Sequence, residues 1–458
     1  MPARYSRSPS PAKVGFPVSR RSVLLGAAGV AGLAAVPSLA ACSSSSSGGT
    51  SAAPASSAAA GGSASAPAAS GTVTVGSNYS DAVPKKAFAD TVAAFTSKSG
   101  VQGSINTVDH NTFQENINSY LQGKPDDVFT WFAGFRMRFF AGQGLAGDIS
   151  DVWDKIGGDF AEGFKNASTG DDGKQYFVPL YNYPWAVFYR PSVWKEKGYE
   201  IPKTLDELKT LGAQMKKDGL TPIALADKDG WPAMGTFDII NMRVNGYDFH
   251  VSLMAGKESW EDQKVKDVFN TWASILDIHT DANAALGATW QEAATTLDQK
   301  KSGMYLLGSF VGQQMTTAKD DFDFFPFPEI NPDHGTDSID APIDGFMMAK
   351  KPKNEDGAKA LLAFLGSAEA ANTYLATDAN DVAANKQADT TKYNAVQKKA
   401  AELIGSTKNI AQFLDRDTRP DFASTVMIPS LQTFLKNPKD VDGLTKQIQS
   451  QAKTIFAS

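Results

Sequence analysis

The spacing of hydrophobic residues predicts alternating strands and helices at the start of the folded region. Val73 and Val75 alternate with polar residues as in a strand, whereas Phe113, Ile117 and Leu121 recur every four residues, as on one face of a helix. The expected order is a strand at residues 73–75, a helix over 83–95, a strand at 103–108, a helix over 113–121 and a strand at 127–132. This alternation indicates a parallel sheet covered by helices, and so an α/β fold.

A second block of strands and helices begins near Tyr181. Its clearest helix start is the capping box from Thr204 to Glu207, in which each side chain satisfies a backbone N–H group of the other residue. The remaining elements expected here are strands at 185–189 and 303–307, an aromatic strand or loop at 322–327, and helices over 260–278, 289–300 and 356–365. The sequence contains no internal repeat.

The first 41 residues are typical of an export signal. Arg20 and Arg21 precede an apolar stretch of roughly 15 residues, which is too short to span a membrane. That stretch ends in small residues before Cys42, the only cysteine in the chain. They resemble a lipobox, which implies that Cys42 becomes the lipid-carrying N-terminus at the outer face of the cell membrane. The alternative is an ordinary signal with an incidental cysteine.

Residues 42–71 are expected to form a flexible linker between the anchor and the folded part. Residues 42–70 contain only Ser, Ala, Gly, Pro, Thr and Cys42, so they lack the apolar surface that folding requires. Residues 1–41 carry five basic residues and no acidic one, so cleavage would leave 39 bases against 50 acids, a net charge of about −11. This acidity argues against binding to nucleic acid and against a basic membrane-binding patch, and it leaves lipid as the membrane anchor.

Four passages, in this order, resemble the family 1 extracellular solute-binding proteins, the maltose-binding-protein-like receptors of ABC sugar importers. Residues 123–131 resemble the family's strand into the ligand cleft. Residues 173–180, followed by the strand 187–190, resemble its first crossing between lobes, and residues 305–310 and 344–349 resemble the second and third crossings. The resemblance covers roughly residues 72–370.

The resemblance implies a two-lobed periplasmic-binding-protein-like fold, each lobe a mainly parallel sheet flanked by helices, with ligand bound between the lobes. The expected division is a signal peptide at 1–41, the linker at 42–71, a first lobe from 72–179 and 308–344, and a second lobe from 180–307 and 345–458. Such a receptor is a monomer that closes on a sugar or oligosaccharide and delivers it to the membrane subunits of an importer with a separate ATPase.

Aromatic residues near the proposed cleft are the main chemical indication of a carbohydrate ligand. An aromatic plane covers the apolar C–H face of a sugar ring, while amides, carboxylates and arginine bind its hydroxyl edge. The alternative is that these rings fill the core. The aromatic ligand-binding residues expected on this basis are Trp131, Phe132, Tyr183, Trp185, Trp231, Trp290 and Phe310.

Polar ligand contacts are expected where strands end and at the crossings. Asn78 and Asp109 follow the first two strands, at the carboxyl ends where open parallel sheets bind ligands. Solvated surface charges or helix caps are the alternative for these residues. The polar residues expected to bind ligand are Asn78, Asp109, Arg136, Asp344, Asp381 and Arg416, and the crossing passages add Ser309 and Gly345.

No cofactor, metal or catalytic residue is expected. Residues 142–147 match the dinucleotide pattern G-x-G-x-x-G, but they follow an expected helix at 133–141 instead of a strand. The four histidines lack ligand spacing, so no zinc site is expected. Two alternatives stay open: a receptor for a non-sugar solute, and a secreted glycoside hydrolase that uses two of the chain's 50 acidic residues.

Overall fold

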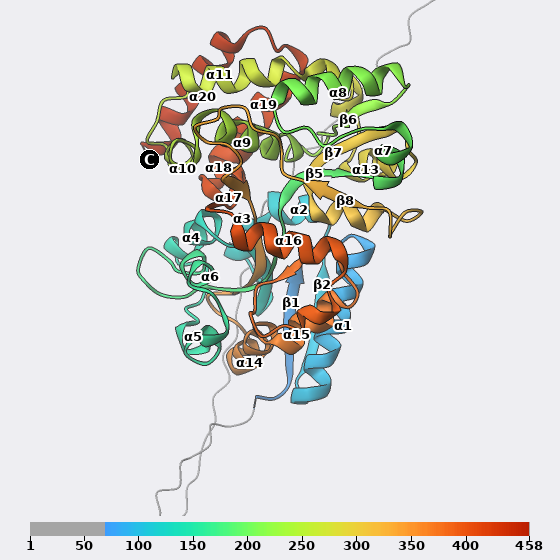
Figure 1. Ribbon diagram of the computed structural model, residues 1–458. Helices are drawn as coiled ribbons and strands as arrows, with labels where there is room; N and C mark the ends of the chain where they lie inside the picture. The colour runs from blue at the N-terminus through green and yellow to red at the C-terminus, as the bar shows by residue number, and fades with distance from the viewer. Residues whose placement is uncertain (1–68, 458) are drawn as a thin grey trace, which may run out of the picture. The chain divides into compact units, whose positions relative to one another are not determined.

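The computed structural model describes residues 69–457, in which two separate sheets form the centres of two lobes (Figure 1). Cys42 and the expected signal and linker, up to residue 68, lie outside the described residues. The first sheet has the strand order β11-β4-β10-β3-β1-β2, and the second has the order β6-β7-β5-β8. We call the first sheet with the helices packed on it the first lobe, and the second sheet with its helices the second lobe.

The first sheet combines a group of parallel strands with strands that pair antiparallel. Its parallel part is β1 (Thr72–Ser77), β2 (Gln102–Thr107) and β3 (Val128–Phe132). The strand β10 (Ile343–Met348) runs antiparallel to β3 and, on its other side, antiparallel to β4 (Phe177–Asn182). The short strand β11 (Val382–Ala383) pairs antiparallel with β4 and forms the edge of the sheet.

The second sheet is mixed as well. The central strands β5 (Trp185–Tyr189) and β7 (Ser302–Gly308) are antiparallel, and β8 (Asp323–Phe325) is antiparallel to β5. Only β6 (Thr221–Ala224) runs parallel to β7. The expected α/β fold is confirmed: most strands of each sheet run in one direction, and β10 and β11 in the first sheet and β5 in the second run against it. Strands that enter a sheet after crossing from the other lobe need not follow the right-handed βαβ connection that makes neighbours parallel.

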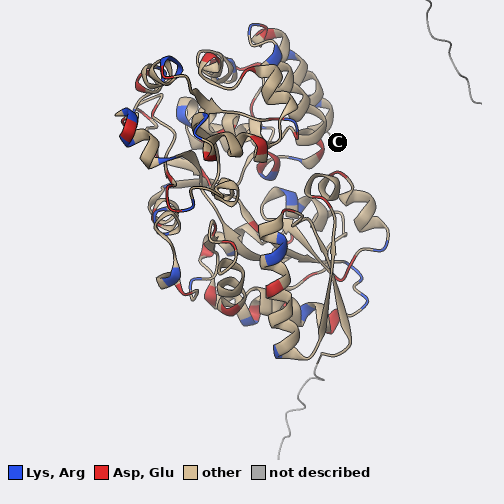
Figure 2. Cartoon of the chain, turned by 90° about the vertical axis from the view of Figure 1, so that its right-hand side faces the viewer, with Lys and Arg blue, Asp and Glu red and all other residues tan. Residues whose placement is uncertain are grey.

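Helices cover both sheets, and charged residues of both signs are spread over them (Figure 2). On the first sheet, α1 (Ala82–Ser99) packs beside α14 (Glu355–Leu365) and α15 (Ala368–Leu375), where Phe88 and Phe95 of α1 are buried. On the second sheet, α8 (Leu205–Lys217) contacts β6, while α9 (Pro232–Asn245) and α13 (Trp290–Asp298) contact β7. The capping box expected at Thr204 and Glu207 is present.

The remaining helices extend each lobe. The other α-helices are α2 (His110–Glu115), α3 (Ile117–Gln122), α4 (Phe135–Gly142), α5 (Ser150–Ile156), α6 (Glu162–Ala167), α7 (Pro191–Lys197), α10 (Tyr247–Met254), α11 (Gln263–Ala273), α12 (Ala282–Gly287), α16 (Ala395–Ser406), α17 (Leu414–Asp417), α18 (Pro420–Phe422), α19 (Ile428–Lys436) and α20 (Val441–Phe456). A further pair of strands, β9 (Ser338–Asp340) and β12 (Asn409–Ala411), is parallel.

Two expected helices are shorter than their hydrophobic spacing suggested. The helix expected over 113–121 is divided at Asn116 into α2 and α3, because Asn116 lies outside helical geometry with φ −97° and ψ 4°. The helix expected over 260–278 contains α11 and ends in a 3₁₀ turn at Leu276–Ile278. In both segments the apolar face continues across the break, so periodicity alone does not reveal it.

The lobe boundaries differ from the expected division. Residues 308–344 were expected in the first lobe, but β8 lies in the second sheet. Residues from 345 onward were expected in the second lobe, but β10 and β11 lie in the first sheet and α14 and α15 pack against α1. The later helices α19 and α20 do pack in the second lobe, on α9 and α11.

Among the described residues, no helix combines the length and the apolar character needed to cross a bilayer.

Candidate ligand-binding site

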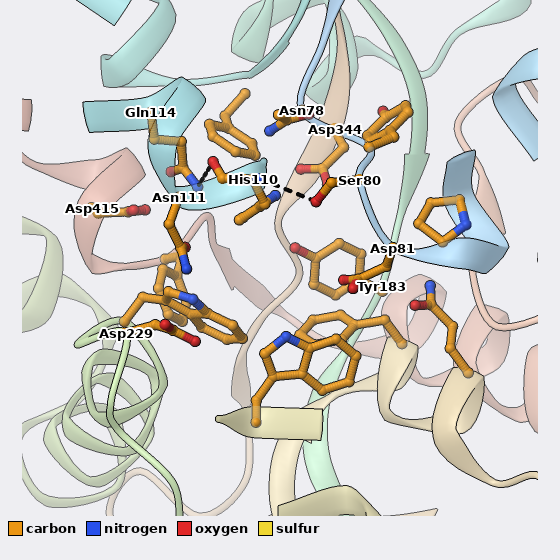
Figure 3. Close-up of a pocket in the computed structure, with 18 of the residues that line it drawn as sticks. Asn78, Ser80, Asp81, His110, Asn111, Gln114, Tyr183, Asp229, Asp344 and Asp415 are labelled. Atoms are coloured by element: carbon orange, nitrogen blue, oxygen red, sulfur yellow. Dashed lines mark hydrogen bonds between the residues drawn. The ribbon is translucent and has the colours of Figure 1, made fainter. Parts of the chain in front are cut away.

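A cavity of about 140 Å³ is lined by side chains from both lobes (Figure 3). The direct connection between the sheets passes along it, because Tyr183 and Pro184 join β4 to β5 and Tyr183 faces the cavity. At roughly 10–15 Å³ for each water-sized group, the space holds about ten such groups, comparable to one sugar ring with its hydroxyls.

The first-lobe wall is mostly polar. Its side chains follow the carboxyl ends of β1 and β2, where parallel strands of one sheet bring their ends together. Others come from β4, from β10 and from the residue just before β11. The first-lobe lining consists of Asn78, Tyr79, Ser80, Asp81, Pro84, Asp109, His110, Asn111, Gln114, Phe132, Tyr181, Asp344 and Asp381.

The second-lobe wall is mostly aromatic and is centred on Phe310. The Phe310 ring lies 5.1 Å from Trp290, 5.9 Å from Trp231 and 6.2 Å from Trp185 between ring centroids. Trp185 also packs on Phe413, at 4.8 Å. These mutual contacts hold the rings in place before any ligand arrives. The remaining lining residues are Tyr183, Asp229, Gln291, Gln313, Asp415 and Arg416.

An ion pair joins the walls at the centre of the site. Arg416 Nη1 donates to Asp344 Oδ1 at 2.6 Å, and Arg416 Nη2 donates to Tyr183 Oη at 3.1 Å. The guanidinium also lies over the Phe132 ring, 4.1 Å from its centroid. Burial raises the pKa of Asp344, and the charge of Arg416 opposes that shift. The guanidinium of Arg416 is thus held in the cavity lining by its two terminal nitrogens, as a charge-assisted pair.

Several buried polar atoms at the cavity have no hydrogen-bond partner within the described protein. Asn78 Nδ2 is one, since only its amide oxygen is used, as acceptor for Thr130 Oγ1 at 2.8 Å. The others at the site are Tyr79 Oη, Trp185 Nε1, Asp381 Oδ1, Asp415 Oδ1 and Arg416 Nε. Buried polar groups are normally paired, so these donors and acceptors are suited to the hydroxyl groups of a ligand.

The charge balance of the cavity favours a neutral or cationic ligand over an anion. Carboxylates line it at Asp81, Asp109, Asp229, Asp344, Asp381 and Asp415, against the single guanidinium of Arg416. Burial raises the pKa of Asp381 well above its usual range, so burial favours its neutral form. Burial also lowers the pKa of His110, which keeps the imidazole uncharged near neutral pH. A phosphorylated ligand would meet repulsion here.

Most of the residues predicted to bind ligand line this cavity, although their contact with ligand stays a prediction. Those in the lining are Asn78, Asp109, Phe132, Tyr183, Trp185, Trp231, Trp290, Phe310, Asp344, Asp381 and Arg416.

Four predicted residues lie outside the lining. Trp131 is on the opposite face of β3 from Phe132 and packs in a core with Phe140. Arg136 stacks on Trp131 with 4.9 Å to the ring centroid. Ser309 donates its hydroxyl to the Asn380 carbonyl, 2.7 Å away. Gly345 lies within β10, where a Cβ atom would come within 2.0 Å of the Val178 carbonyl oxygen.

The sequence interpretation missed lining residues of two kinds. The first kind lies close in sequence to predicted residues, either after the strand ends or near Tyr183, Trp231 and Trp290: Tyr79, Ser80, Asp81, Pro84, His110, Asn111, Gln114, Tyr181, Asp229 and Gln291. The second kind comes from segments with no periodic signal or motif: Gln313, Phe413 and Asp415.

The segment that carries Phe413 has an unusual backbone held by buried carboxylates. Phe413 has φ +133°, a conformation that non-glycine residues rarely adopt. Asp417 Oδ2 accepts from the backbone N–H of Gln412 at 2.7 Å, and Asp238 Oδ2 accepts from that of Leu414 at 2.6 Å. These bonds fix the turn that presents Phe413 to the cavity, consistent with strain stored at a functional site.

Behind this turn, Asp238, His250 and Asp340 form a buried group whose side-chain atoms lie within 4.8 Å of one another, as metal ligands would. The hydrogen bonds argue against a metal. Asn241 Nδ2 is 3.1 Å from His250 Nδ1, and Asn245 Nδ2 donates to the Asn241 oxygen, so the Asn241 amide must donate to Nδ1. The neutral ring then carries its hydrogen on Nε2, the atom that faces the carboxylates, and has no lone pair there for a metal.

The sequence profile of the bacterial extracellular solute-binding proteins matches residues 57–372. A two-lobed α/β protein with a ligand-sized cavity between its lobes is the architecture of such receptors, and this chain belongs to that family.

Similar proteins include one close structural relative. The solved structure of the bacterial solute receptor AcbH, described as having an exclusive substrate preference for β-D-galactopyranose, is 48% identical. It covers 84% of this chain and 99% of its own, with a TM-score of 0.82. An uncharacterized ABC transporter extracellular-binding protein of Pyrococcus horikoshii is 25% identical over 345 residues, covering 73% of this chain and 75% of its own.

A chitin oligosaccharide binding protein shares the fold at 20% identity, with a TM-score of 0.75 and coverage of 84% of this chain and 99% of its own.

Proposed function

We propose that this protein is an extracytoplasmic receptor that binds a sugar between its lobes and delivers it to an ABC importer. The observation that carries the proposal is the opposition of a polar wall and an aromatic wall across a cavity about the size of one sugar ring. Such a cavity covers the C–H face of a ring with aromatic planes and meets its hydroxyls with amides and carboxylates.

We further propose that the preferred ligand is a single pyranose of the galactose type. The relative AcbH, at 48% identity, is described as a receptor for β-D-galactopyranose, which is neutral and of the size that the cavity accommodates. The carboxylates that line the cavity disfavour a phosphorylated solute, so a neutral sugar is the better fit.

The test is a thermal-shift screen of residues 69–458 against D-galactose, D-glucose, galactose 6-phosphate and a set of oligosaccharides, followed by calorimetry. A ligand at about 100 times its dissociation constant adds about 2.7 kcal/mol of stability, which is readily detected. We expect D-galactose to stabilise the protein most and the phosphate to have no effect. Absence of stabilisation by every sugar would reject the proposed function.

Ligand is proposed to shift an equilibrium between open and closed lobes, with Tyr183 and Pro184 among the connecting residues. Small-angle scattering should give a smaller radius of gyration when D-galactose is saturating. If calorimetry demonstrates that a ligand binds and the scattering profile nevertheless stays unchanged, that result would argue against lobe closure.

The family consists of binding proteins, and we propose that this chain likewise does not hydrolyse its ligand. Prolonged incubation with galactosyl oligosaccharides should yield no cleavage products by chromatography. Release of monosaccharide by the purified chain, lost in a variant of a lining carboxylate, would instead indicate a glycosidase.

The family is extracellular, and we propose that this chain is anchored by lipid on Cys42 as a monomer. Cys42→Ser should release the protein into the medium or leave the precursor uncleaved. Unchanged processing and unchanged membrane retention would reject the anchor, and light scattering of the purified protein tests the monomer.

A further inference from the structure

The cavity is bounded on two sides by polar pairs that connect parts of the chain far apart in sequence. On one side, Gln291 Nε2 donates to the Asp81 carboxylate, at 3.2 Å to Oδ1 and 3.4 Å to Oδ2. Asp81 occupies the N-cap position of α1 in the first lobe without a side-chain capping bond, and Gln291 is in the first turn of α13 in the second lobe. Both residues line the cavity, so this bond spans the cleft between the lobes.

On the other side, Arg136 of α4 pairs with Asp415 of α17. Arg136 Nη1 donates to Asp415 Oδ2 at 2.8 Å and to Gln114 Oε1 at 2.7 Å. Figure 3 shows Gln114 and Asp415 on one side of the pocket and Asp81 on the other. The side chains of Arg136 and Asp415 are only 10% and 14% exposed, so separating them would leave a buried charge unpaired.

The two boundaries differ in how easily they open. The Arg136 pair is ionic and largely buried, whereas the Gln291 bond joins a neutral amide to a carboxylate, and both of its residues are partly exposed. A hydrogen bond of this kind contributes modestly to stability. A second sugar ring joined to the bound one would therefore be admitted first at the Asp81–Gln291 side.

We infer that the Asp81–Gln291 bond limits the ligand to one sugar ring, with Gln291 as a residue that determines chain length. This inference rests on the proposed function, since it concerns which sugars the same cavity accepts. A cavity of about 140 Å³ has room for one ring, and a second ring needs the space that the Gln291 side chain and its bond to Asp81 occupy.

The experiment measures affinities for D-galactose and for β-1,4-galactobiose. Either ring of this disaccharide can occupy the cavity, so the other ring extends from C4 or from C1 of the bound one. D-glucose and cellobiose serve as a second pair. We expect the wild-type protein to prefer D-galactose by about 100-fold or more, because steric exclusion discriminates strongly. In Gln291→Ala this preference should fall by about 10-fold or more, through tighter binding of the disaccharide relative to the monosaccharide.

Gln263→Ala is the matched control. Gln263 Nε2 donates to Asp267 Oδ1 at 2.8 Å on the exposed surface of α11, so its loss removes the same kind of bond outside the cavity lining. It should leave both affinities unchanged.

The possible results distinguish the proposed receptor function from the proposed one-ring limit and the role of Gln291. If no sugar binds the wild-type protein, the proposed function fails. If D-galactose binds and galactobiose binds equally well, the one-ring limit is overturned while the receptor function stands. If the wild-type protein prefers D-galactose and Gln291→Ala keeps the same ratio of affinities for D-galactose and galactobiose, the role of Gln291 is overturned. This includes the result that both affinities fall by the same factor.

Discussion

The two lobes contribute different chemistry to the same cavity. The first lobe presents amides and carboxylates from the ends of parallel strands, whereas the second presents indole and phenyl rings packed around Phe310. The aromatic wall is organised by ring contacts, and the polar wall by short hydrogen bonds such as that from Thr130 to Asn78. A ligand must therefore offer an apolar face to one lobe and a hydroxyl edge to the other.

The two walls also have different effects on a bound sugar: the aromatic wall contributes mainly to its affinity and the polar wall to its orientation. Aromatic planes supply contact area but tolerate rotation of a ring, whereas hydrogen bonds fix which hydroxyl points where. We expect substitutions in the second lobe to weaken binding of all sugars, and substitutions in the first lobe to change the order of preference among them.

The largest expected effect comes from the link between the walls. Arg416→Met leaves the buried Asp344 carboxylate unpaired, which should lower the free energy of unfolding by about 3–5 kcal/mol and abolish measurable binding. Arg419→Met is the control, because Arg419 pairs with the more exposed Asp421 and such pairs contribute about 1 kcal/mol or less. Equal melting temperatures for the two variants would show that the Arg416 pair does not hold the walls together.

On the aromatic wall, Trp231→Ala should weaken sugar binding by about 1–3 kcal/mol, or roughly ten- to a hundredfold. Trp231 precedes α9 and contacts Trp185 and Phe310 through its ring. Because Trp231 is only partly buried, the melting temperature should change little. Calorimetry beside a melting curve tests both statements. Native affinity would remove Trp231 from the site, and a collapsed melting temperature would make it a core residue.

On the polar wall, Asn78→Asp is a nearly isosteric change that replaces one group. The oxygen that accepts from Thr130 is kept, while the unpartnered Nδ2 donor becomes a carboxylate oxygen. We expect binding to weaken by about 1–2 kcal/mol, with a changed ranking among epimeric sugars. The exposed Asn283→Asp is the control for added charge. A uniform loss for all sugars would contradict the assigned role of this wall.

The smallest effect on sugar binding is expected at Asp227, which lies outside the cavity lining in the turn that leads to Trp231 and α9. Burial raises the pKa of Asp227 to about 7, and its carboxylate accepts from the Ala233 N–H at 2.9 Å. Between about pH 4, the unfolded value, and pH 7 the folded protein binds more protons here than the unfolded chain, so this group's contribution to stability falls as pH rises.

Asp227→Asn removes that titration. The difference in melting temperature, variant minus wild type, should therefore increase as the pH is raised from 5 to 8, as measured by calorimetry at several pH values. Asp248→Asn, on the first turn of α10, serves as a surface control. A difference that stays constant across this range would show that Asp227 is ionised throughout.

Elements with strong local signals were predictable from the sequence. The capping box at Thr204 defined the start of α8, and the apolar runs at residues 185–189 and 303–307 correspond to β5 and β7. The direction of strands was not predictable. The strand β10 lies between β3 and β4 because of contacts between segments far apart in the chain, and its local sequence does not specify them.

The site was predictable only in part, for the same reason. Strand ends indicated Asn78 and Asp109, but β3 is buried on both faces, so the sequence could not tell that Phe132 and not Trp131 faces the cavity. The aromatic and acidic residues of the segment around Phe413 carry no periodic pattern, because that turn is held by Asp238 and Asp417 through tertiary hydrogen bonds.

The position of β10 within the first sheet has a consequence for how the protein is made. A ribosome delivers the chain from its N-terminus, and the four strands of the second sheet all lie between residues 185 and 325. In the first sheet, β4 pairs only with β10 and β11, so it has no partner strand until residue 343 and beyond have been synthesised. The lobe that begins first in translation is thus the one whose sheet is completed last.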